Sequence, residues 1–505
     1  MRGVIAAGDA LTAKAGADIL RAGGNAFDAA CAALLAAPLS EPALSSLGGG
    51  GFLMAYSPGE KPKLYDFFVD VPPNSDTAPD FYPIYVDFGT AVQEFHVGAG
   101  STAIPGQVAG IDKIHRELGK IDIEAVVAPA LSYAKNGIHL STIQSDLIKL
   151  LEPIFLSTEN SKKIYAPSGK LISNSELFYN QEYGDFLELF VKDGAKCFYK
   201  GDLAKDIDKY YRENGGLLNY EELANYDVKV REAISFDYLD YTVYTNPPPS
   251  SGGILIAFAL ELIQSNDYTE FQSIEYIKEL IETFAVTAEF RNSVIDAKLH
   301  DNELTAVLNN ENLIEHYKQS LNSRVNLWGN TTHISIIDAE GNCASVTSTN
   351  GEGSGVVIPN TGIMMNNMLG EEDLNPHGFF KWPSGIRLPS MMAPTILLEE
   401  NIPKLVLGSA GSNRIRSAII EVIERHLRFG NGIQKAVDAP RMHLEKNELF
   451  FEPGFDSKII SEAKKHYSVN EFKDLNLFFG GVNAVTGNYT GGADIRRGGA
   501  VEIVD

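Results

Sequence analysis

Residues 331–349 read TTHISIIDAEGNCASVTST, and this stretch carries the strongest structural pattern in the chain. His333, Ser335 and Ile337 alternate with Ile334 and Ile336, which is the period of two expected of a β-strand. The four residues AEGN at 339–342 are typical of a turn, and residues 343–349 repeat the strand pattern. The stretch therefore predicts two strands joined by a turn, with a pair of threonines at the very start of the first strand.

A threonine at that position has a specific chemical use if the peptide bond before it is cut. Its hydroxyl is then the nucleophile and its own α-amine is the base. An α-amine has a pKa of about 7.7–8.0, which suits proton transfer near neutral pH. The hydroxyl of Thr331 can itself attack the preceding carbonyl, that of Asn330. Taken alone, however, Thr-Thr-His in a strand is explained by β-propensity.

Outside this stretch, the patterns alternate between helical and extended. Residues 8–22 and about 26–38 predict two helices, and residues 107–330 are mostly helical in pattern. A proline-rich segment, PPPSSGG at 247–253, precedes an apolar helix that starts near Ile254. Further strands are predicted at 52–56, 64–69, 362–367, 393–398, 404–408, 481–487 and 498–504, with a strong helix ending near Arg428.

Four consecutive glycines, Gly48 to Gly51, lead into the strand at 52–56. Such a run gives up much backbone entropy on folding, so it needs a structural or functional reason. A tight helix-to-strand connection and a close approach of the backbone to a ligand explain it about equally well.

Composition excludes several classes of function. The 505 residues carry a net charge of -24, and a surface this acidic repels nucleic acid and anionic lipid. The three cysteines are far apart in sequence, which favours neither a disulfide framework nor a zinc site and fits a cytoplasmic protein. No signal peptide is apparent, and the apolar stretch from Ala29 to Leu39 is too short to cross a bilayer. No ligand cluster indicates a metal or an organic cofactor.

A series of short blocks resembles the γ-glutamyltransferase family. In order, they are GDALTAKAGADILRAGGNAFDAA, GGGGF, STAIPGQVAG, NPPPSSGG, TTHISIIDAEGNCASVT, GSGVVIP with TGIMMNN, LPSMMAPTI, GSAGSNRI and ADIRRGGA. They extend from residue 8 to residue 500 and so cover nearly the whole chain. The resemblance implies an α+β fold, a four-layer αββα sandwich of the N-terminal-nucleophile hydrolase type. It also implies a precursor that cuts itself into a large-subunit region, 1–330, and a small-subunit region, 331–505, intertwined as one domain.

The resemblance also assigns residues. Thr331 is the implied nucleophile, Thr349 supports its amine, and the backbone N–H groups of Gly411 and Ser412 hold the oxyanion. A small-residue turn before a helix offers free N–H groups to an anion, although GSAG alone is an ordinary strand-to-helix turn. The implied substrate-binding residues are Glu371 for an α-amine, Ser390 for a carboxylate, and Asn350 as the nearest match to the family asparagine. His333 is expected to be structural.

Three departures from the family pattern concern recognition. The family places a carboxylate-binding arginine after an Asp-Phe pair, where this chain has Phe68. Phenylalanine cannot replace a bidentate guanidinium–carboxylate contact. Met391 replaces the second of two family serines, and the segment between Glu371 and Ser390 is short. We hypothesise that Arg387 supplies the missing positive charge.

The sequence thus predicts a self-processed γ-glutamyltransferase-like amide hydrolase or acyltransferase that acts on γ-glutamyl compounds such as glutathione. Its partners are a small-molecule amide and its own two fragments, and an oligomer of identical chains is left open. One alternative is an acylase for a non-glutamyl amide, which Phe68 favours. The other is an unprocessed homologue that only binds a ligand.

Overall fold

The computed structural model describes residues 2–75, 77–87, 92–263, 268–300, 304 and 330–505. Its centre is a seven-stranded sheet, the first sheet, in which all neighbouring strands are antiparallel. In spatial order, the strands are β22 (Ala500–Val504), β1 (Gly3–Ala7), β11 (Thr332–Asp338), β12 (Cys343–Thr349), β2 (Gly50–Tyr56), β3 (Lys63–Phe67) and β8 (Lys229–Glu232).

A second, six-stranded antiparallel sheet packs face to face on the first. Its order is β21 (Gly491–Gly492), β20 (Gly481–Thr486), β16 (Ile402–Ala410), β15 (Thr395–Glu399), β10 (Tyr241–Thr245) and β9 (Ile234–Tyr238). The central strands β11 and β12 of the first sheet lie against β16, and β11 also lies against β20.

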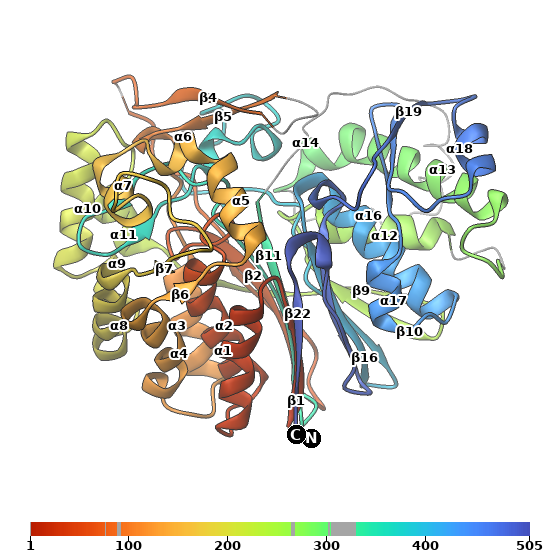
Figure 1. Cartoon of the computed structure of the whole chain (residues 1–505), viewed down its shortest axis with the longest axis horizontal. Helices are drawn as coiled ribbons and strands as arrows, with labels where there is room; N and C mark the ends of the chain where they lie inside the picture. Colours follow the sequence, from red (N-terminus) through yellow and green to blue (C-terminus); the bar gives the residue numbers. More distant parts are fainter. Residues whose placement is uncertain (1, 76, 88–91, 264–267, 301–303, 305–329) are drawn as a thin grey trace.

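Helices cover the outer face of each sheet (Figure 1). The first sheet is covered by α1 (Ala10–Arg21), α2 (Ala26–Ser40) and α3 (Gln107–Leu118), and α4 (Ile123–Asn136) packs outside α2. The second is covered by α12 (Gly252–Ile263), α16 (Ile415–Ile423) and α17 (Ile433–Asp438), and α13 (Ile274–Phe290) packs on α12. The four-layer αββα sandwich predicted from the sequence is therefore confirmed.

The remaining helices and strands lie outside the two large sheets. The helices are α5 (Thr142–Leu150), α6 (Glu152–Phe155), α7 (Glu159–Tyr165), α8 (Gln181–Asp193), α9 (Lys196–Tyr199), α10 (Asp202–Glu213), α11 (Tyr220–Asn225), α14 (Asp296–Lys298) and α18 (Ser457–Ala463). The strands are β4 (Tyr82–Asp87), β5 (Val92–Val97), β6 (Ile138–His139), β7 (Leu177–Phe178), β13 (Val357–Ile358), β14 (Ile363–Met364), β17 (Met442–Glu445), β18 (Glu448–Phe451) and β19 (Ser468–Glu471). None of the helices in the described part of the chain is both long and apolar enough to cross a membrane.

Helix α2 shows how the sequence builds the outer layer. Asn25 and Asp28 form a reciprocal capping box that satisfies the first N–H groups of the helix. Every residue of α2 is buried, because the helix lies between the first sheet and α4. Its many alanines allow this close packing on all sides, and Ile334 and Ile336 of β11 belong to the same core.

The space between the two sheets contains a polar cluster as well as apolar side chains. The buried His333 ring lies against Gly408, where an added Cβ would come within 2.3 Å of the ring. His333 Nδ1 is 2.7 Å from Thr347 Oγ1, and its Nε2 is 2.9 Å from Ser335 Oγ. Burial lowers the His333 pKa to about 3, so the ring is neutral. These contacts give His333 a structural role between the sheets.

One sequence-based prediction about these elements is confirmed, and another was wrong. The described part of the middle of the chain is mostly helical, as predicted, although residues 229–245 form strands β8, β9 and β10. The part of that prediction at 301–303 and 305–329 lies outside the described residues. The strand expected at 362–367 is only the two-residue β14, because Thr361 Oγ1 and Asn366 turn the chain there through hydrogen bonds to Ile358 O and Gly48 O.

The two regions 1–330 and 331–505 are interleaved in both sheets. In the first sheet, β11 and β12 from the second region lie between β1 and β2 from the first. In the second sheet, β9 and β10 come from the first region and the other strands from the second. A cut between Asn330 and Thr331 would therefore leave two fragments that share both sheets.

Candidate active site

The start of β11 lies at the end of the sandwich opposite the chain termini (Figure 1). Gly3 pairs with Asp338 at the other end of β11, so Thr332 is remote from the N-terminus. The Tyr56 hydroxyl, which is at that terminal end of the first sheet, donates to Asn401 O just before β16. Strand β16 begins at the end of the sandwich that holds the chain termini and runs towards the opposite end. The last residue of β16 and the Gly411 turn therefore lie at the same end as Thr331.

Thr331 directly precedes β11 and is 5% exposed. The alternation along β11 directs Thr332 towards α1 and α2, where its hydroxyl donates to Glu41 at 2.7 Å. His333 faces the second sheet. Side chains two residues apart in a strand point to the same face, so Thr331 is expected to point the same way as His333. The strand thus places the Thr331 side chain on the face between the sheets.

Thr349 ends β12 beside the start of β11, as the pairing of Thr332 with Ser348 requires. Its hydroxyl donates a hydrogen bond to the carbonyl oxygen of Asn330, which belongs to the peptide bond before Thr331. The same hydroxyl accepts from Gly351 N at 3.0 Å. A donor on this carbonyl stabilises negative charge on its oxygen, which is what attack by Thr331 would create.

Gly411 and Ser412 form a left-handed turn between β16 and α16. Gly411 has φ +116° and Ser412 has φ +52°. A Cβ on Gly411 would approach Gly480 Cα to 2.8 Å, so only glycine fits. Among the described residues, no turn or loop hydrogen bond from the backbone N–H of Gly411 or Ser412 to a carbonyl oxygen is present. The Ser412 hydroxyl donates to the Asp373 carboxylate at 2.7 Å. Successive free N–H groups before a helix suit an oxyanion.

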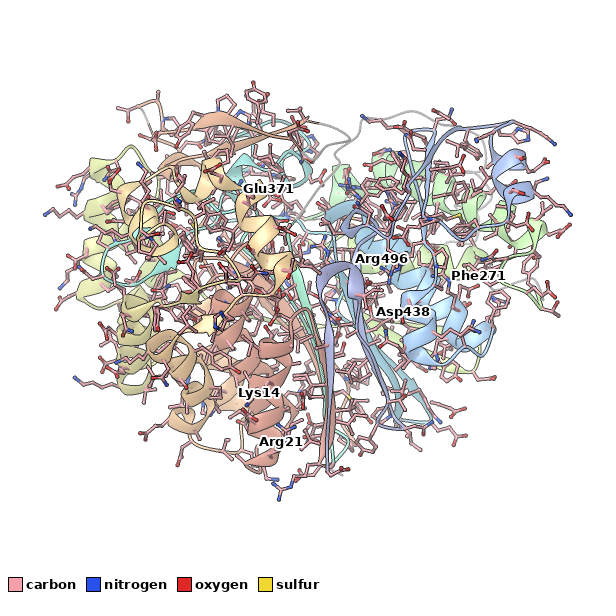
Figure 2. The ribbon with its side chains drawn as sticks, in the orientation of Figure 1. Lys14, Arg21, Phe271, Glu371, Asp438 and Arg496 are labelled. Atoms are coloured by element: carbon pink, nitrogen blue, oxygen red, sulfur yellow. The ribbon has the colours of Figure 1, made fainter. Side chains whose placement is uncertain are left out.

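Glu371 lies at the same end of the molecule (Figure 2). Its Oε1 is buried without a hydrogen-bond partner among the described residues, and a Cβ on Gly351 would be 2.4 Å from it. Burial, then the Glu352 and Asp373 carboxylates, raise the Glu371 pKa well above its usual range. Burial raises the pKa of Glu352 to about 8. Raised pKa values mean that these two neighbouring carboxylates retain a proton when no cation is bound. A bound ammonium group would supply positive charge and replace that proton.

Asn350 and Ser390 are buried, but their contacts differ. The Oδ1 atom of Asn350 has no partner in the described structure and adjoins the Thr349 segment. The Ser390 hydroxyl accepts from Met392 N at 3.1 Å, and its carbonyl accepts from Ser251 N at 2.8 Å. No hydrogen bond between described residues joins Ser390 to Thr331, Thr349 or the Gly411 turn. Met391 is part of the core instead, and its Sδ accepts from the Ser251 hydroxyl.

Phe68, which replaces the family arginine, is a core residue. It is fully buried, and its ring stacks on Phe52 with centroids 5.3 Å apart. This position therefore offers no polar group to a substrate.

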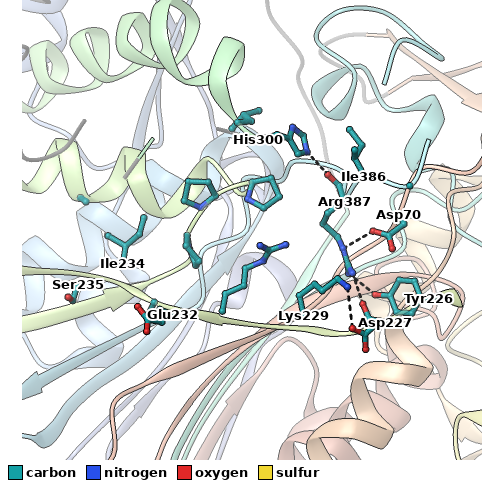
Figure 3. A pocket seen from close by; sticks show the side chains of 18 of the residues that line it. Asp70, Tyr226, Asp227, Lys229, Glu232, Ile234, Ser235, His300, Ile386 and Arg387 are labelled. Atoms are coloured by element: carbon teal, nitrogen blue, oxygen red, sulfur yellow. Dashed lines mark hydrogen bonds and ion pairs between the residues drawn. The ribbon is translucent and has the colours of Figure 1, made fainter. Parts of the chain in front are cut away.

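Arg387 is not a free cation. Its guanidinium pairs with Asp70 Oδ1 at 2.8 Å and Asp66 Oδ1 at 3.2 Å, and it donates to Tyr226 and Asp227 (Figure 3). Arg387, Asp70, Tyr226 and Asp227 line a cavity of about 1020 Å³ beside β8 and β9, whose described lining does not contain Thr331 or Thr349. The structure argues against the hypothesis that Arg387 supplies the missing charge, because two carboxylates already neutralise it.

The four glycines at 48–51 form a tight connection, and the close approach they allow is to the chain's own backbone. They connect a helix to β2, and added Cβ atoms on Gly48, Gly49 and Gly51 would come within 2.1–2.4 Å of carbonyl oxygens. For Gly49, that oxygen is Thr349 O. The close approach is therefore to the strand that ends in Thr349.

Sequence reasoning missed three carboxylates around the site: Glu41, Glu352 and Asp373. Asp373 follows two other acidic residues, and such runs are usually solvated, so nothing in the sequence singled it out. Glu352 lies between glycines, which was the one available indication of a buried special position. In the described residues, no group of three or more His, Cys, Asp or Glu is arranged to hold a metal.

The αββα sandwich, with a threonine directly before a central strand, is the fold of the N-terminal-nucleophile hydrolases. Within that class, the chain belongs to the Gamma-glutamyltranspeptidase family, whose model matches residues 12–504.

Three known proteins illustrate the similarity. The chain is 27% identical to the Glutathione hydrolase proenzyme of Bacillus subtilis (strain 168) over 536 residues, covering 99% of this chain and 91% of that protein. It is 28% identical to the Acylase ACY 1 proenzyme of Pseudomonas sp. (strain SE83), with 99% and 93% covered. The structure of cephalosporin acylase from Bacillus halodurans matches with a TM-score of 0.87 and 23% identity, covering 99% of this chain and 95% of that one, which supports the fold.

Proposed function

We propose that this protein cuts itself between Asn330 and Thr331 and then hydrolyses or transfers γ-glutamyl groups from compounds such as glutathione. The observation that carries the proposal is the hydrogen bond from the Thr349 hydroxyl to the Asn330 carbonyl oxygen, in the peptide bond before Thr331. The proenzyme names of two relatives agree with a self-cleaving precursor.

In the first reaction, the Thr331 hydroxyl attacks the Asn330 carbonyl carbon. The peptide bond breaks as an ester forms, and the Thr331 nitrogen becomes a free amine. Water then hydrolyses the ester and releases the Asn330 carboxylate. The Thr349 hydroxyl stabilises the oxyanion of this step.

In the second reaction, the new α-amine accepts the hydroxyl proton as Thr331 attacks a substrate amide. The Gly411 and Ser412 N–H groups hold the oxyanion, and the proton passes to the departing amine. Water or a second amine then releases the acyl group. Glu371, with Glu352 beside it, binds the α-ammonium of a γ-glutamyl group, because that cation takes the place of a proton in the buried carboxylate pair.

A second candidate is an acylase for a non-glutamyl amide. The buried Phe68 and the paired Arg387 both favour it, because neither offers a cation to the glutamyl carboxylate. The similarity to an acylase proenzyme agrees with this candidate.

The two candidates differ in whether the substrate needs an α-amine. The test compares kcat/KM for γ-glutamyl-p-nitroanilide and glutaryl-p-nitroanilide, which differ only in that amine. The proposal predicts at least tenfold preference for the γ-glutamyl compound. A preference for the glutaryl compound would support the acylase, and no turnover of either by a correctly cut protein would contradict both.

A further inference from the structure

Arg416 is a buried cation that lacks a direct partner. It lies in α16, four residues after Ser412, and is 4% exposed. No hydrogen bond or ion pair joins its guanidinium to another described residue, and its Nη1 is buried without a partner. A buried charge without a paired group is costly, so such a residue usually has a ligand.

The Arg416 side chain lines a cavity of about 560 Å³. Other walls come from Arg291 at the end of α13, from His377 and Phe379, and from Asp373 and Asn413. Asp373 also binds the Ser412 hydroxyl, at 2.7 Å, so this cavity shares a wall with the proposed oxyanion turn. Its position therefore suits a part of the substrate that lies beyond the bond being cut.

Carboxylates also line the cavity, but three of them already have hydrogen-bond or ion-pair partners. Asp373 accepts from Ser412 and Asn413, and Glu445 accepts from Asn413 Nδ2 at 3.1 Å. Asp296 pairs with Arg291 Nε at 3.3 Å. Glu372 is exposed at the rim, as is Lys446, which carries the opposite charge. Arg416 is thus a buried cation without a direct partner among the described residues, although Glu445 Oε2 also lacks a hydrogen-bond partner there.

Burial is the main charge penalty on Arg416. Burial, and then the Arg291 charge, lower the pKa of Arg416 to about 10, although the Glu445 and Asp296 charges oppose this. The first turn of α16 adds a favourable helix dipole for a negative group. A carboxylate in the cavity would offset the burial cost and the repulsion between the two guanidinium groups, and guanidinium geometry matches a carboxylate.

We infer that the Arg416 cavity binds a carboxylate of the substrate, remote from the amide that is cut. This inference rests on the proposed function for its assignment to a substrate. The carboxylate has two sources: the far end of the acyl group, or the amine that leaves or accepts it. Neither Phe68 nor the paired Arg387 offers a free cation to the first source, and a peptide amine would carry the second.

Binding of unreactive ligands separates this inference from catalysis. Calorimetric titration of the wild-type protein compares glutarate with butyrate for the acyl source, and glycylglycine with glycylglycinamide for the amine source. Each pair differs in the remote carboxylate. We expect about 10- to 100-fold tighter binding of the carboxylate-bearing member in one pair, which identifies the source.

Two variants then test the residue. Arg416→Met should abolish that preference, and Arg416→Lys should retain part of it with unchanged thermal unfolding. Equal binding within both pairs by the wild-type protein, or a preference that survives Arg416→Met, would overturn the inference. Because these ligands need neither self-cleavage nor turnover, a protein that binds glutarate selectively but cleaves no amide would contradict the proposed function alone.

Discussion

The Thr349 hydroxyl donates a hydrogen bond to the carbonyl oxygen of Asn330, the residue before the proposed nucleophile. The register between β11 and β12 fixes this contact, because Thr332 pairs with Ser348 and leaves Thr349 beside the scissile carbonyl. The same hydroxyl is held by Gly351 N at 3.0 Å, so it is oriented before any reaction begins.

Thr349→Val keeps the side-chain shape but removes this donor. We expect self-cleavage to slow by about 100-fold, the usual cost of losing one oxyanion donor. Thr349→Ser, which retains the hydroxyl, should cut within a few-fold of the wild-type rate. The measurement is the time course of fragment appearance on a denaturing gel, and equal rates for the Val and Ser variants would contradict a role for the hydroxyl.

Gly411→Ala tests the oxyanion turn. An alanine at φ +116° is strained, and its Cβ would be 2.8 Å from Gly480 Cα, so the turn must move. We expect kcat of the cut enzyme to fall by about 100-fold or more. Gly430→Ala is the matched control, since Gly430 also has positive φ, +65°, but no atom lies within 4 Å of the added Cβ. A similar fall in kcat for both variants would refute a special role for Gly411.

Glu371→Gln should weaken recognition of an α-ammonium group. We expect KM for γ-glutamyl-p-nitroanilide to rise by about 10- to 100-fold, while KM for the amine-free glutaryl analogue stays constant or falls. The exposed neighbour Glu372 provides the control, as Glu372→Gln should leave both values near wild type. If Glu371→Gln raised both KM values equally, the carboxylate would not be an amine-binding group.

Glu41, behind the nucleophile strand, makes stability depend on pH. Burial raises its pKa from 4.5 to about 7, although the Thr12 and Thr332 hydroxyls donate to it. The folded state therefore holds a proton that the unfolded state loses above about pH 4.5. This contribution to stability is complete below that pH and is lost as the pH rises to about 7.

Glu41→Gln removes that titration. The free energy of unfolding of the wild type, minus that of the variant, should fall by about 3 kcal/mol between pH 4.5 and 8. Denaturant titrations at each pH measure it, and the comparison cancels other buried groups such as Glu421 and Glu424. A difference that is constant with pH would mean that Glu41 is not buried as a proton-holding acid.

The sequence predicted the fold correctly because its strands and turns depend on local pattern, and Thr331 as the nucleophile stays a prediction. The alternation in TTHISII predicts a strand, and the structure has β11 at Thr332–Asp338. The small-residue run before α16 likewise predicts a turn with free N–H groups. Such features depend on residue type and spacing, which a sequence displays directly.

The partners of charged side chains could not be predicted in the same way. Arg387 was expected to be free for a substrate, but the chain folds Asp66 and Asp70 onto it from more than 300 residues away. The sequence did not single out Arg416, although this arginine is buried without a direct partner among the described residues and so indicates a ligand site. Long-range pairing of this kind depends on tertiary packing, so charge type alone did not reveal it.

Self-cleavage at Thr331 is the central claim, and intact mass spectrometry of the purified protein beside Thr331→Ala tests it most directly. We predict two fragments for the wild type, about two-thirds and one-third of 55.0 kDa, with the smaller beginning at Thr331, and one full-length chain for the variant. A wild-type protein that stays a single chain under all folding conditions, or a variant that is cut equally well, would contradict the account.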